Sequence, residues 1–369
     1  MSDSVHVDLG ARSYDVSIGA FPPDAVADRI AAALGPNLTG VAVLIDAHVA
    51  ERSARARALI GALAARLPRV DRLELRPGEA CKNLAEIEKT CEWLAARGYD
   101  RRAAVVGIGG GAATDHAGFA AAVYLRGVPF ALVPTTLLAM VAASVGGKTG
   151  VDLGAGKNLV GAFHQPRAVV ADVGFLETLP TRERIAGLAE VVKCGFIADP
   201  GLLDLLEQSG AELTVAQQQE VIARAVRVKA EVVASDETES GRRAILNFGH
   251  TVGHALEAAS GYGLLHGEAV ALGMVAALDL GAALAIGAPA LAARARGLLT
   301  RLGLPVDYER RFDAQAQAGI AVDKKRRGST IRFVFVPAPG ETRLVEIAPA
   351  DIASHLQLAR SGGRPAAKA

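Results

Sequence analysis

The chain has 369 residues, of which 51% are hydrophobic and 21% are charged. So much apolar side chain excludes a globally disordered protein, and the length is typical of about two domains. The 40 basic and 39 acidic residues leave a formal net charge of +1, so composition gives no support for binding nucleic acid or an acidic membrane.

The first half of the chain alternates short apolar runs with segments of helical spacing. Continuous apolar runs are typical of strands that are buried on both faces of a parallel sheet. This alternation predicts an α/β domain with an open parallel sheet. The expected strands are 41–46, 72–75, 103–108 and 130–133, and the expected helices are 55–66, 84–97 and 115–124.

From about residue 174, long segments rich in Ala, Leu, Glu and Val predict a mostly α-helical domain. The expected helices are 182–196, 201–207, 214–235, 250–259, 267–282 and 289–302. Two late strands, 330–336 and 342–346, flank the turn PAPG. We therefore divide the chain into domains at 1–173 and 174–357, followed by a tail at 358–369 that we expect to be disordered.

Three cysteines without a CxxC spacing predict neither a disulfide framework nor a thiolate zinc site. The N-terminus lacks a secretory signal, and prolines interrupt the longest apolar run, 128–145, which we interpret as buried strand and loop. We expect a cytoplasmic protein with no membrane partner and no nucleic-acid partner.

Three consecutive glycines, Gly109, Gly110 and Gly111, follow a predicted strand, and Asp115 lies in the helix that comes next. Glycines allow a backbone to approach a pyrophosphate, whose charge a helix N-terminus favours. The spacing does not match GxGxxG, so an ordinary tight turn between strand and helix is an equal alternative.

The stretch RAILNFGHTVGH places Arg243, Asn247, His250 and His254 on one face, if it is helical. His250 and His254 have the spacing of two ligands to one metal, but Thr251 occupies the position of the zinc-peptidase general base, which excludes that activity. His266 follows nearby in LLHGEA. The alternative is a group of ordinary core histidines.

Glu190 and Lys193 lie one helical turn apart in an apolar segment. A carboxylate on an apolar helix needs a partner. That partner could be a metal, because one carboxylate with two imidazoles is a common open catalytic site. A local ion pair with Lys193 is the simpler alternative.

Several basic residues stand in non-basic surroundings. Scattered Lys and Arg usually form a solvated face, but the glycine-flanked Lys148 and Lys157 favour binding of a phosphate or carboxylate. The full set comprises Arg126, Lys148, Lys157 beside Asn158, Lys229, Arg243, Lys324 and Lys325.

Together, these motifs resemble the 3-dehydroquinate synthase family of sugar phosphate cyclases. The resemblance runs from about residue 41 to 336 and is carried by GGGAATDHAGFAAAVYLRGVPFALVPTTLLAMVAASVGGKTGVDLGAGKNLVGAFHQP, TLPTRERIAGLAEVVK, VKAEVVASDETESGRRAILNFGHTVGHALE, LLHGEAVALGM and DKKRRGSTIRFV. Iron-type polyol dehydrogenases are more distant relatives that share the fold and the metal histidines but not the lysines.

The resemblance implies a nucleotide-binding domain, a helical domain and a site in the cleft between them. It implies one divalent metal, zinc or cobalt, held by Glu190, His250 and His266, which makes His254 a substrate or proton-transfer residue. It also implies retained NAD. The implied NAD contacts are Asp46, Glu79, Lys82, Gly109, Gly110, Gly111, Asp115, Thr135, Thr136, Lys148, Lys157, Thr178, Leu179 and Glu183.

The substrate that the resemblance implies is 3-deoxy-arabino-heptulosonate 7-phosphate, whose two anionic groups suit a cationic site. C5 is oxidised with NAD, phosphate is eliminated, C5 is reduced again, and an aldol closure gives the carbocycle 3-dehydroquinate. Arg126 would reach the phosphate of the neighbouring subunit's site, which implies a homodimer. The implied substrate contacts are Lys148, Asn158, Lys193, Lys229, Arg243, Asn247, His254, Lys324 and Lys325.

Two residues depart from the family pattern. The family usually has Asp where LLAMVAASVGGK has Ala142, and tends to have Asn where His48 stands. Loss of that Asp removes a charge-assisted hydrogen bond to substrate hydroxyls. The alternatives are therefore a variant cyclase such as aminodehydroquinate synthase, then an iron-type polyol dehydrogenase, then a pseudoenzyme that binds NAD and metal without turnover.

Overall fold

The computed structural model describes residues 3–321, 326–327 and 329–360. The chain forms two compact units. The first comprises Met1–Pro180 and Thr214–Thr238, and the second comprises Thr181–Leu213 and Glu239–Ala369. The chain thus returns to the first unit after the second has begun.

A seven-stranded sheet forms the centre of the first unit. Its strands are β1 (Asp3–Val7), β2 (Tyr14–Gly19), β3 (Gly40–Asp46), β4 (Val70–Leu75), β5 (Ala103–Gly109), β6 (Phe130–Pro134) and β9 (Ala168–Asp172). Their order in space is β1-β2-β9-β6-β5-β3-β4, and all neighbours are parallel except the antiparallel pair β1 and β2. Every residue of β3, β5, β6 and β9 is buried, which explains their continuous apolar sequences.

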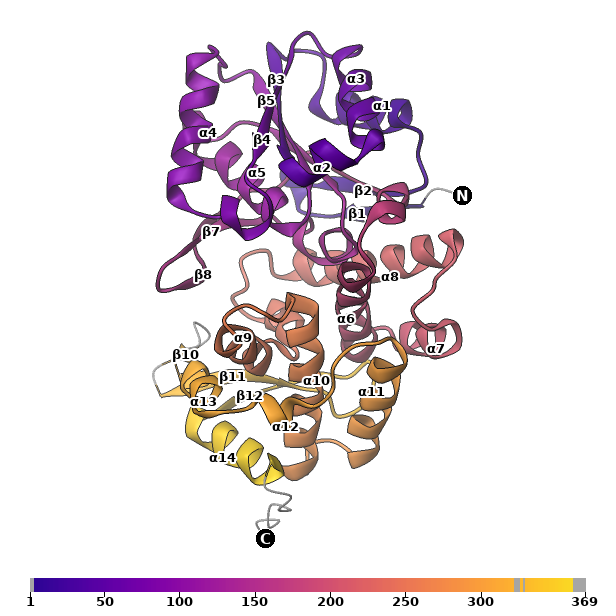
Figure 1. Cartoon of the computed structure of the whole chain (residues 1–369), viewed down its shortest axis with the longest axis vertical. Coiled ribbons are helices and arrows are strands. Elements are labelled where there is room, and N and C mark those ends of the chain that lie inside the picture. The colour runs from indigo at the N-terminus through magenta and orange to yellow at the C-terminus, as the bar shows by residue number, and fades with distance from the viewer. Residues whose placement is uncertain (1–2, 322–325, 328, 361–369) are drawn as a thin grey trace. The chain divides into compact units, whose positions relative to one another are not determined.

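Helices flank this sheet. They are α1 (Pro23–Leu34), α2 (Ala47–Arg52), α3 (Ala54–Ala64), α4 (Leu84–Ala96), α5 (Gly111–Val123) and α8 (Val215–Ser235), with the short helices η1 (Gly10–Arg12), η2 (Gly78–Cys81), η3 (Tyr124–Arg126), η4 (Ala139–Ala143) and η5 (Val173–Thr178). Figure 1 shows the sheet between α1 with α3 on one side and α4 with α5 on the other. The Asn83 side chain caps α4, and a capping box of Thr214 and Gln217 begins α8.

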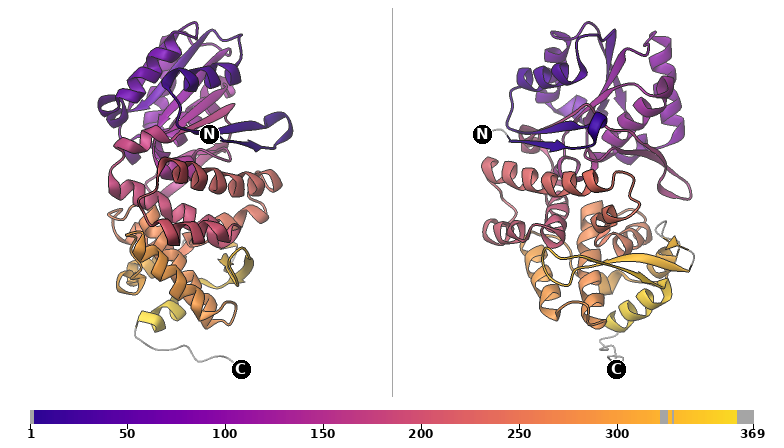
Figure 2. Two further views of the ribbon diagram at one scale, coloured as in Figure 1. Left: turned by 90° about the vertical axis from the view of Figure 1, so that its right-hand side faces the viewer. Right: turned by 180° about the vertical axis from the view of Figure 1, so that it is seen from behind.

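Two hairpins of the first unit are absent from the predicted elements. One is β1–β2, which projects from the sheet in Figure 2. The other joins β7 (Lys148–Leu153) to β8 (Gly156–Phe163) and packs against α5. Helix α1 and strand β9 were also not predicted. The hairpin strands alternate exposed and buried residues or contain several glycines, so they lack a long apolar run.

The second unit is mostly helical. Its elements are α6 (Thr181–Ile197), α7 (Pro200–Ser209), η6 (Arg242–Asn247), α9 (His250–Ala259), α10 (His266–Ala283), α11 (Pro289–Arg301), α12 (Tyr308–Arg311), α13 (Ala314–Ala321), β10 (Arg326–Arg327), β11 (Thr330–Phe335), β12 (Arg343–Ile347) and α14 (Pro349–Arg360). Helix α10 is buried along almost its whole length, because α6, α9 and α11 pack around it. The three strands form a small antiparallel sheet.

The α/β plus helical fold class is confirmed, as are all seven elements predicted for the first half. The placement of 214–235 in the helical domain is wrong, because α8 packs against β1, β2 and η4 of the first unit. The first unit also continues to Pro180, beyond the predicted boundary at 173. Helix α14 includes 358–360, which were assigned to the tail, and 361–369 lie outside the described residues.

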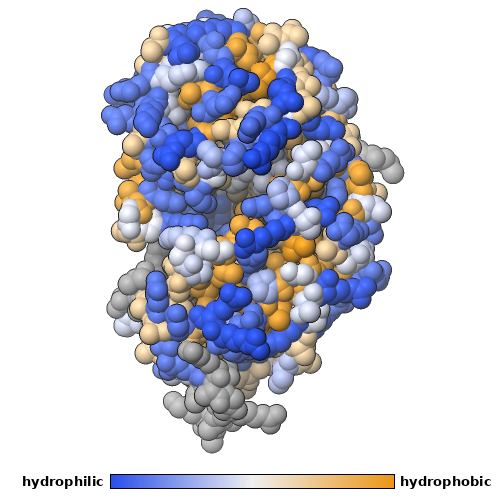
Figure 3. Space-filling view, viewed as in Figure 1, coloured by the Kyte–Doolittle hydropathy of each residue, from blue (hydrophilic) through white to orange (hydrophobic). Residues whose placement is uncertain are grey.

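No helix in the described part of the chain is long and apolar enough to cross a membrane. On the face shown in Figure 3, hydrophobic side chains are scattered among a majority of hydrophilic ones. No disulfide links Cys81, Cys91 and Cys194 in the described part of the chain.

Candidate active site

Three neighbouring parallel strands of the first unit end beside predicted cofactor residues. Strand β3 ends at Asp46, β5 ends at Gly109, and β6 ends just before Thr135. In the sheet, β3 lies between β4 and β5. The order in which the chain adds strands therefore reverses direction after β4. Ligands of open α/β sheets bind outside the carboxyl ends of the strands at such a reversal. These three residues therefore lie where a dinucleotide is expected.

The carboxylate of Asp46 organises the backbone at this edge. It accepts hydrogen bonds from two N–H groups at the start of α2, at 2.9 and 3.3 Å, and from the N–H of Gly78 at 3.1 Å. A Cβ on Gly109 would lie 2.6 Å from the Cβ of Ala113 and 3.1 Å from that of Asp46. Glycine is therefore required at this strand end, and Gly110 then leads into the N-terminus of α5.

Lys82, which is 5% exposed, is the centre of a polar cluster. Its ammonium donates to Asp115 Oδ2 at 2.7 Å and to Asn158 Oδ1 at 2.6 Å. Burial would lower the pKa of Lys82, but Asp115 and Glu79 raise it above its usual value. Burial in turn raises the pKa of Asp115 against the opposing effect of Lys82. The structure thus brings three other predicted site residues, Glu79, Asp115 and Asn158, around the Lys82 cation.

Lys157 and Asp152 extend this cluster. Lys157 Nζ lies 3.8 Å from Glu79 Oε1, and burial raises the pKa of Glu79 against Lys82 and Lys157. Asp152 accepts from the N–H of Asn158 at 2.7 Å, and its own N–H donates to the Lys82 carbonyl at 2.8 Å. Asp152 was not predicted, although an acid within the glycine- and lysine-rich stretch GVDLGAGKN was a usable signal.

Lys229 of α8 donates a hydrogen bond to the backbone carbonyl of Ala142 in η4. This contact joins one of the implied substrate-binding lysines to the position that departs from the family pattern. Lys148 is exposed at the start of β7. A backbone carbonyl, and not a carboxylate side chain, is therefore what position 142 offers to Lys229.

The other predicted residues of the first unit lie at element ends. Gly111 begins α5, and the Thr136 hydroxyl accepts from the N–H of Ala139 at 3.1 Å. Thr178 is the last residue of η5, and Leu179 follows it. Arg126 is exposed in η3 with a left-handed φ of 68°. These positions leave their predicted contacts with NAD and phosphate as predictions.

Three helices of the second unit bring together Glu190, His250 and His266. Glu190 lies within α6, and the two histidines are the first residues of α9 and α10. Helix α10 approaches α6 closely because Gly267 has no side chain, and a Cβ there would collide with the Ala186 carbonyl oxygen. Side chains from three separate segments therefore converge, which local sequence spacing could not establish.

One oxygen of Glu190 faces both imidazoles. Its Oε1 lies 3.5 Å from His250 Nε2 and 3.8 Å from His266 Nε2, while Oε2 accepts from Lys193 Nζ at 2.5 Å. Burial alone would raise the pKa of Glu190, but Lys193, His266 and His250 hold that pKa well below its usual value. Glu190 is therefore an ionised carboxylate.

The ring nitrogens of the two histidines are oriented for a cation. Nδ1 of His250 lies 3.0 Å from the Phe248 carbonyl oxygen, and Nδ1 of His266 lies 3.4 Å from Glu257 Oε2. Because these oxygens only accept, each Nδ1 carries a proton, and each ring would offer an Nε2 lone pair to a cation that displaces the proton there. Both Nε2 atoms face Glu190 Oε1, a buried atom with no hydrogen-bond partner among the described residues. A divalent metal would satisfy all three atoms, so this donor set fits one.

His254 lies beside the same point. One ring nitrogen from each of His250, His254 and His266 lies within 4.8 Å of the others. The ring centroids of His254 and His250 are 5.3 Å apart. Two possible ligand sets therefore meet at this point. One is the His250–His254 pair that the spacing favours, and the other is the set of Glu190, His250 and His266 that the resemblance implies.

Arg243 and Asn247 belong to η6 and not to the helix of the histidines. Gly249 has a left-handed φ of 78°, and α9 begins only at the next residue. The interpretation of 243–254 as one helical face is therefore wrong. Arg243 is nevertheless buried, and Asn247 Nδ2 donates to Glu239 Oε1 at 2.5 Å.

Three further predicted residues and one missed residue complete this unit. Lys324 and Lys325 lie outside the described residues. Glu183 lies in the first turn of α6, and burial raises its pKa. Glu257, which contacts His266, was missed. Its signal was a carboxylate in the apolar stretch HALEAA, two helical turns after His250.

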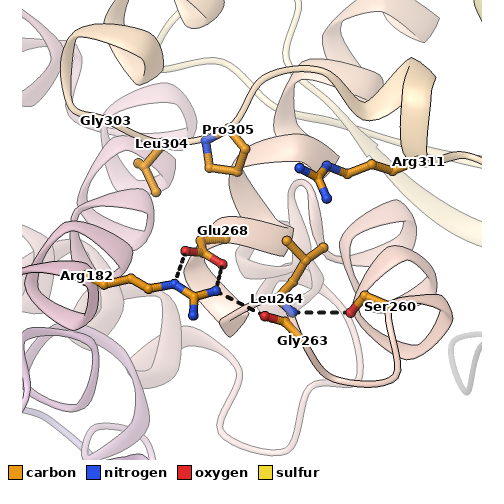
Figure 4. A pocket seen from close by; sticks show the side chains of 9 residues that line it. All are labelled: Arg182, Ser260, Gly263, Leu264, Glu268, Gly303, Leu304, Pro305 and Arg311. Atoms are coloured by element: carbon orange, nitrogen blue, oxygen red, sulfur yellow. Dashed lines mark hydrogen bonds and ion pairs between the residues drawn. The ribbon is translucent and has the colours of Figure 1, made fainter.

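A cavity of about 560 Å³ lies next to the start of α10 (Figure 4). Arg182 forms a bidentate pair with Glu268 there, at 2.7 Å for both contacts, and donates to the Gly263 carbonyl at 3.0 Å. Glu268 also accepts from the N–H of Leu265 at 2.9 Å. None of the predicted site residues lines this cavity. The pair links the starts of α6 and α10, the helices that carry Glu190 and His266.

Comparison with known proteins gives a consistent result. The family model described as 3-dehydroquinate synthase N-terminal matches residues 72–186, and the one described as 3-dehydroquinate synthase C-terminal matches 187–326. The 3-dehydroquinate synthase of Rhodospirillum rubrum is 44% identical over 99% of this chain and 96% of its own length.

Two solved structures share the fold. One is 2-deoxy-scyllo-inosose synthase complexed with carbaglucose-6-phosphate, NAD⁺ and Co²⁺, with a TM-score of 0.85 and 25% identity over 96% of this chain and 99% of that one. The other is 2-epi-5-epi-valiolone synthase from Streptomyces hygroscopicus subsp. jinggangensis 5008 with NAD⁺ and Zn²⁺ bound, with a TM-score of 0.82 and 29% identity over 95% and 97%.

The parallel-sheet unit and the helical unit thus define a protein of the dehydroquinate synthase-like fold class. The chain belongs to the 3-dehydroquinate synthase family.

Proposed function

We propose that this chain is a 3-dehydroquinate synthase, which converts 3-deoxy-arabino-heptulosonate 7-phosphate to 3-dehydroquinate and phosphate in the shikimate pathway. The observation that carries the proposal is the convergence of Glu190 Oε1 with Nε2 of His250 and of His266. This cluster occurs in a chain that the two family models cover from residue 72 to 326.

In this proposal, Glu190, His250 and His266 hold one Zn²⁺ or Co²⁺, and NAD binds at the carboxyl edge of the sheet. When bound, NAD supplies reversible oxidation at C5, and the metal lowers the pKa of the reacting hydroxyl. The cofactor-binding residues are Asp46, Glu79, Lys82, Gly109, Gly110, Gly111, Asp115, Thr135, Thr136, Lys148, Lys157, Thr178, Leu179 and Glu183.

The remaining site residues bind the substrate or move protons. Lys193 and Arg243 are buried cations, and each can pair with an anionic group of the substrate once water is excluded. The His254 imidazole adjoins the proposed metal position and can transfer a proton to or from a hydroxyl bound there. The other substrate-binding residues are Lys148, Asn158, Lys229, Asn247, Lys324 and Lys325, with Arg126 reaching the partner subunit's site.

The reaction class is tested by measuring phosphate and NADH in the same assay. The cyclase should release phosphate for many turnovers per NAD, without a steady rise in NADH absorbance. A rise in NADH that matches product formation would instead establish a polyol dehydrogenase. Binding of NAD and metal with no phosphate release from any heptulosonate phosphate would establish a pseudoenzyme.

Ala142 is the test of substrate choice. A hydrogen bond to a charged group contributes roughly 1.5–3 kcal/mol, or on the order of 10- to 150-fold in kcat/KM when it persists in the transition state. We expect wild type to cyclise the heptulosonate phosphate, and Ala142→Asp to raise kcat/KM on it within that range.

The comparison is repeated with the 4-amino analogue of the substrate. Aminodehydroquinate synthase is the correct assignment if wild type strongly prefers the analogue and Ala142→Asp abolishes activity on the heptulosonate phosphate. The carbonyl of Ala142 already accepts from Lys229, so a gain smaller than 10-fold would mean that this contact replaces part of the missing carboxylate.

We also infer a homodimer in the cytoplasm. The exposed position of Arg126, in an η3 turn with two left-handed residues, supports a role outside its own subunit. Three cysteines without a disulfide in the described part of the chain suit a reducing compartment. Sedimentation equilibrium of wild type should give a dimer. Complementation between an inactive Arg126→Ala chain and an inactive His254→Ala chain, mixed as a heterodimer, would show the shared site.

A further inference from the structure

Glu257 is a buried carboxylate for which the proposed reaction has no direct use. It lies on α9, two turns after His250, and is 3% exposed. An ionised carboxylate in such surroundings is costly unless it is paired and hydrogen-bonded. Its Oε2 lies 3.4 Å from His266 Nδ1, on the side of the ring away from the nitrogen that faces Glu190. The carboxylate therefore contacts a proposed metal ligand without approaching the metal position itself.

The two histidines differ in what receives their Nδ1 protons. His250 donates to the backbone carbonyl of Phe248, which follows η6 and lies two residues before His250. His266 is the first residue of α10 and has no such local acceptor in the described contacts, so its proton goes to a side chain of α9. An oriented, protonated Nδ1 directs the Nε2 lone pair toward the metal, and a carboxylate acceptor makes that lone pair more basic.

The backbone of Glu257 also anchors the chain that leads to His266. Its carbonyl accepts from the Ser260 hydroxyl at 2.7 Å and from the Tyr262 N–H at 3.1 Å. The Ser260 hydroxyl oxygen in turn accepts from the N–H of Leu264 at 3.2 Å. The loop from α9 to α10 is thus held by the same residue whose side chain holds the ring at the loop's end.

We propose that Glu257 is a positioning residue for the metal centre, which fixes the proton of His266 on Nδ1 and aims Nε2 at the metal. The inference rests on the proposed metal site of Glu190, His250 and His266. Removal of such a partner of a metal-bound histidine costs about 10- to 100-fold in metal affinity. Glu257 touches neither substrate nor NAD in this assignment, so NAD affinity should be unchanged.

The test measures Co²⁺ affinity by competition with a chromophoric chelator, using the full chain with Glu257→Gln and Glu257→Leu. The Gln oxygen can still accept a hydrogen bond but carries no charge, whereas Leu cannot accept at all. We expect Co²⁺ affinity to fall in the order Glu, Gln, Leu, with Leu weakened by about 10- to 100-fold. The visible spectrum of bound Co²⁺ should shift in the Leu variant, because the coordination geometry at His266 relaxes.

Asp279→Asn is the matched control. Asp279 is a carboxylate on α10 itself, and it pairs with Arg296 at 2.6 Å, away from the histidines. This variant should bind Co²⁺ within twofold of wild type. A purely structural role for Glu257 predicts that metal affinity follows the thermal midpoint of the apoprotein. A positioning role predicts that Leu binds Co²⁺ worst even where its midpoint equals that of wild type, since an apolar residue can replace a buried charge without loss of stability.

Two results would overturn the inference, and they are distinguishable. Wild-type Co²⁺ affinity in both folded Glu257 variants would remove the positioning role and leave the proposed function intact. A wild-type chain that binds neither Co²⁺ nor Zn²⁺ would remove the proposed function and the inference together. Because Gln has nearly the shape of Glu, the Gln variant decides the question even where the Leu variant fails to fold.

Discussion

A histidine in each unit shows how differently two buried imidazoles can be used. His116 in α5 is fully buried, with Nδ1 2.8 Å from the Cys81 carbonyl and Nε2 2.8 Å from the Thr90 hydroxyl. Burial lowers its pKa. Burial would also lower the pKa of His266, but Glu190 and Glu257 raise it to about 9.

The difference lies in the partners and not in the burial. Neutral groups satisfy both nitrogens of His116, so nothing further can bind to it. Carboxylates face both nitrogens of His266, and that of Glu190 lies beside the Nε2 atom that a cation would bind. A buried histidine is therefore a ligand candidate only where anionic oxygen atoms converge with it.

The strongest test of this contrast is loss of the metal. His266→Ala or Glu190→Ala removes one of three converging donor atoms, so we expect loss of bound Zn²⁺ or Co²⁺ and at least about a 100-fold fall in phosphate release, the effect of several kcal/mol of lost transition-state stabilisation. Metal analysis after dialysis, together with the phosphate assay, measures both. Stoichiometric metal in His266→Ala would remove that residue from the ligand set.

His254 separates proton transfer from metal binding. Because the proposed ligand set excludes it, His254→Ala should keep its metal while turnover falls by about 100-fold or more, as for loss of a general acid or base. The same metal analysis and phosphate assay apply. Loss of metal in a folded His254→Ala protein would restore the pair of histidines that the sequence spacing favours.

The core histidine should affect stability alone. His116→Leu removes hydrogen bonds to the Cys81 carbonyl and the Thr90 hydroxyl. At about 0.5–1.5 kcal/mol for each bond, we expect the free energy of unfolding to fall by about 1–3 kcal/mol. Fluorescence of Trp93, the single tryptophan of the chain, reports on the first unit during urea unfolding. Weaker Co²⁺ binding in this variant would contradict the contrast.

The pH dependence of stability should also differ. His116 has a lowered pKa in the folded chain, so only the unfolded chain takes up its proton below about pH 6.5. Stability from this group is thus present above pH 6.5 and falls with acidification, by up to about 1.4 kcal/mol per pH unit. The free-energy difference between wild type and His116→Leu should shrink from pH 7.5 to 5.5. A difference that stays constant over this range would mean that His116 titrates normally.

The smallest effect is expected at the edge of the metal cluster. Arg182 pairs with Glu268 but is 60% exposed, so the pair contributes no more than about 1 kcal/mol. Arg182→Gln should weaken Co²⁺ binding by at most about fivefold. Arg184→Gln, which removes a similar α6 pair with Glu212, is the control and should have no effect on Co²⁺. Equal weakening in both variants would remove any link between the Arg182–Glu268 pair and the metal.

Sequence patterns predicted most of the elements because burial imposes a periodicity. Strand 103–108 and helix 250–259 were predicted within one residue of their observed bounds. Prediction failed where tertiary contacts decide the conformation. Helix α9 begins only after Gly249, so it does not extend back to Arg243. Gly249 has a left-handed φ and packs so closely on α10 that a Cβ on it would lie 3.0 Å from the Val270 carbonyl oxygen.

The sequence by itself determined the two kinds of unit, the glycine-bearing strand end and the supply of histidines, lysines and carboxylates. Only the tertiary structure decided which of these meet. It joins Glu190 to His250 and His266 through close packing of α6, α9 and α10, gives Glu257 its contact with His266, and places Lys229 against Ala142. These pairs are separated by 9 to 87 positions in the chain. Local spacing constrains neighbours within a few turns, whereas long-range side-chain contacts depend on how the helices pack.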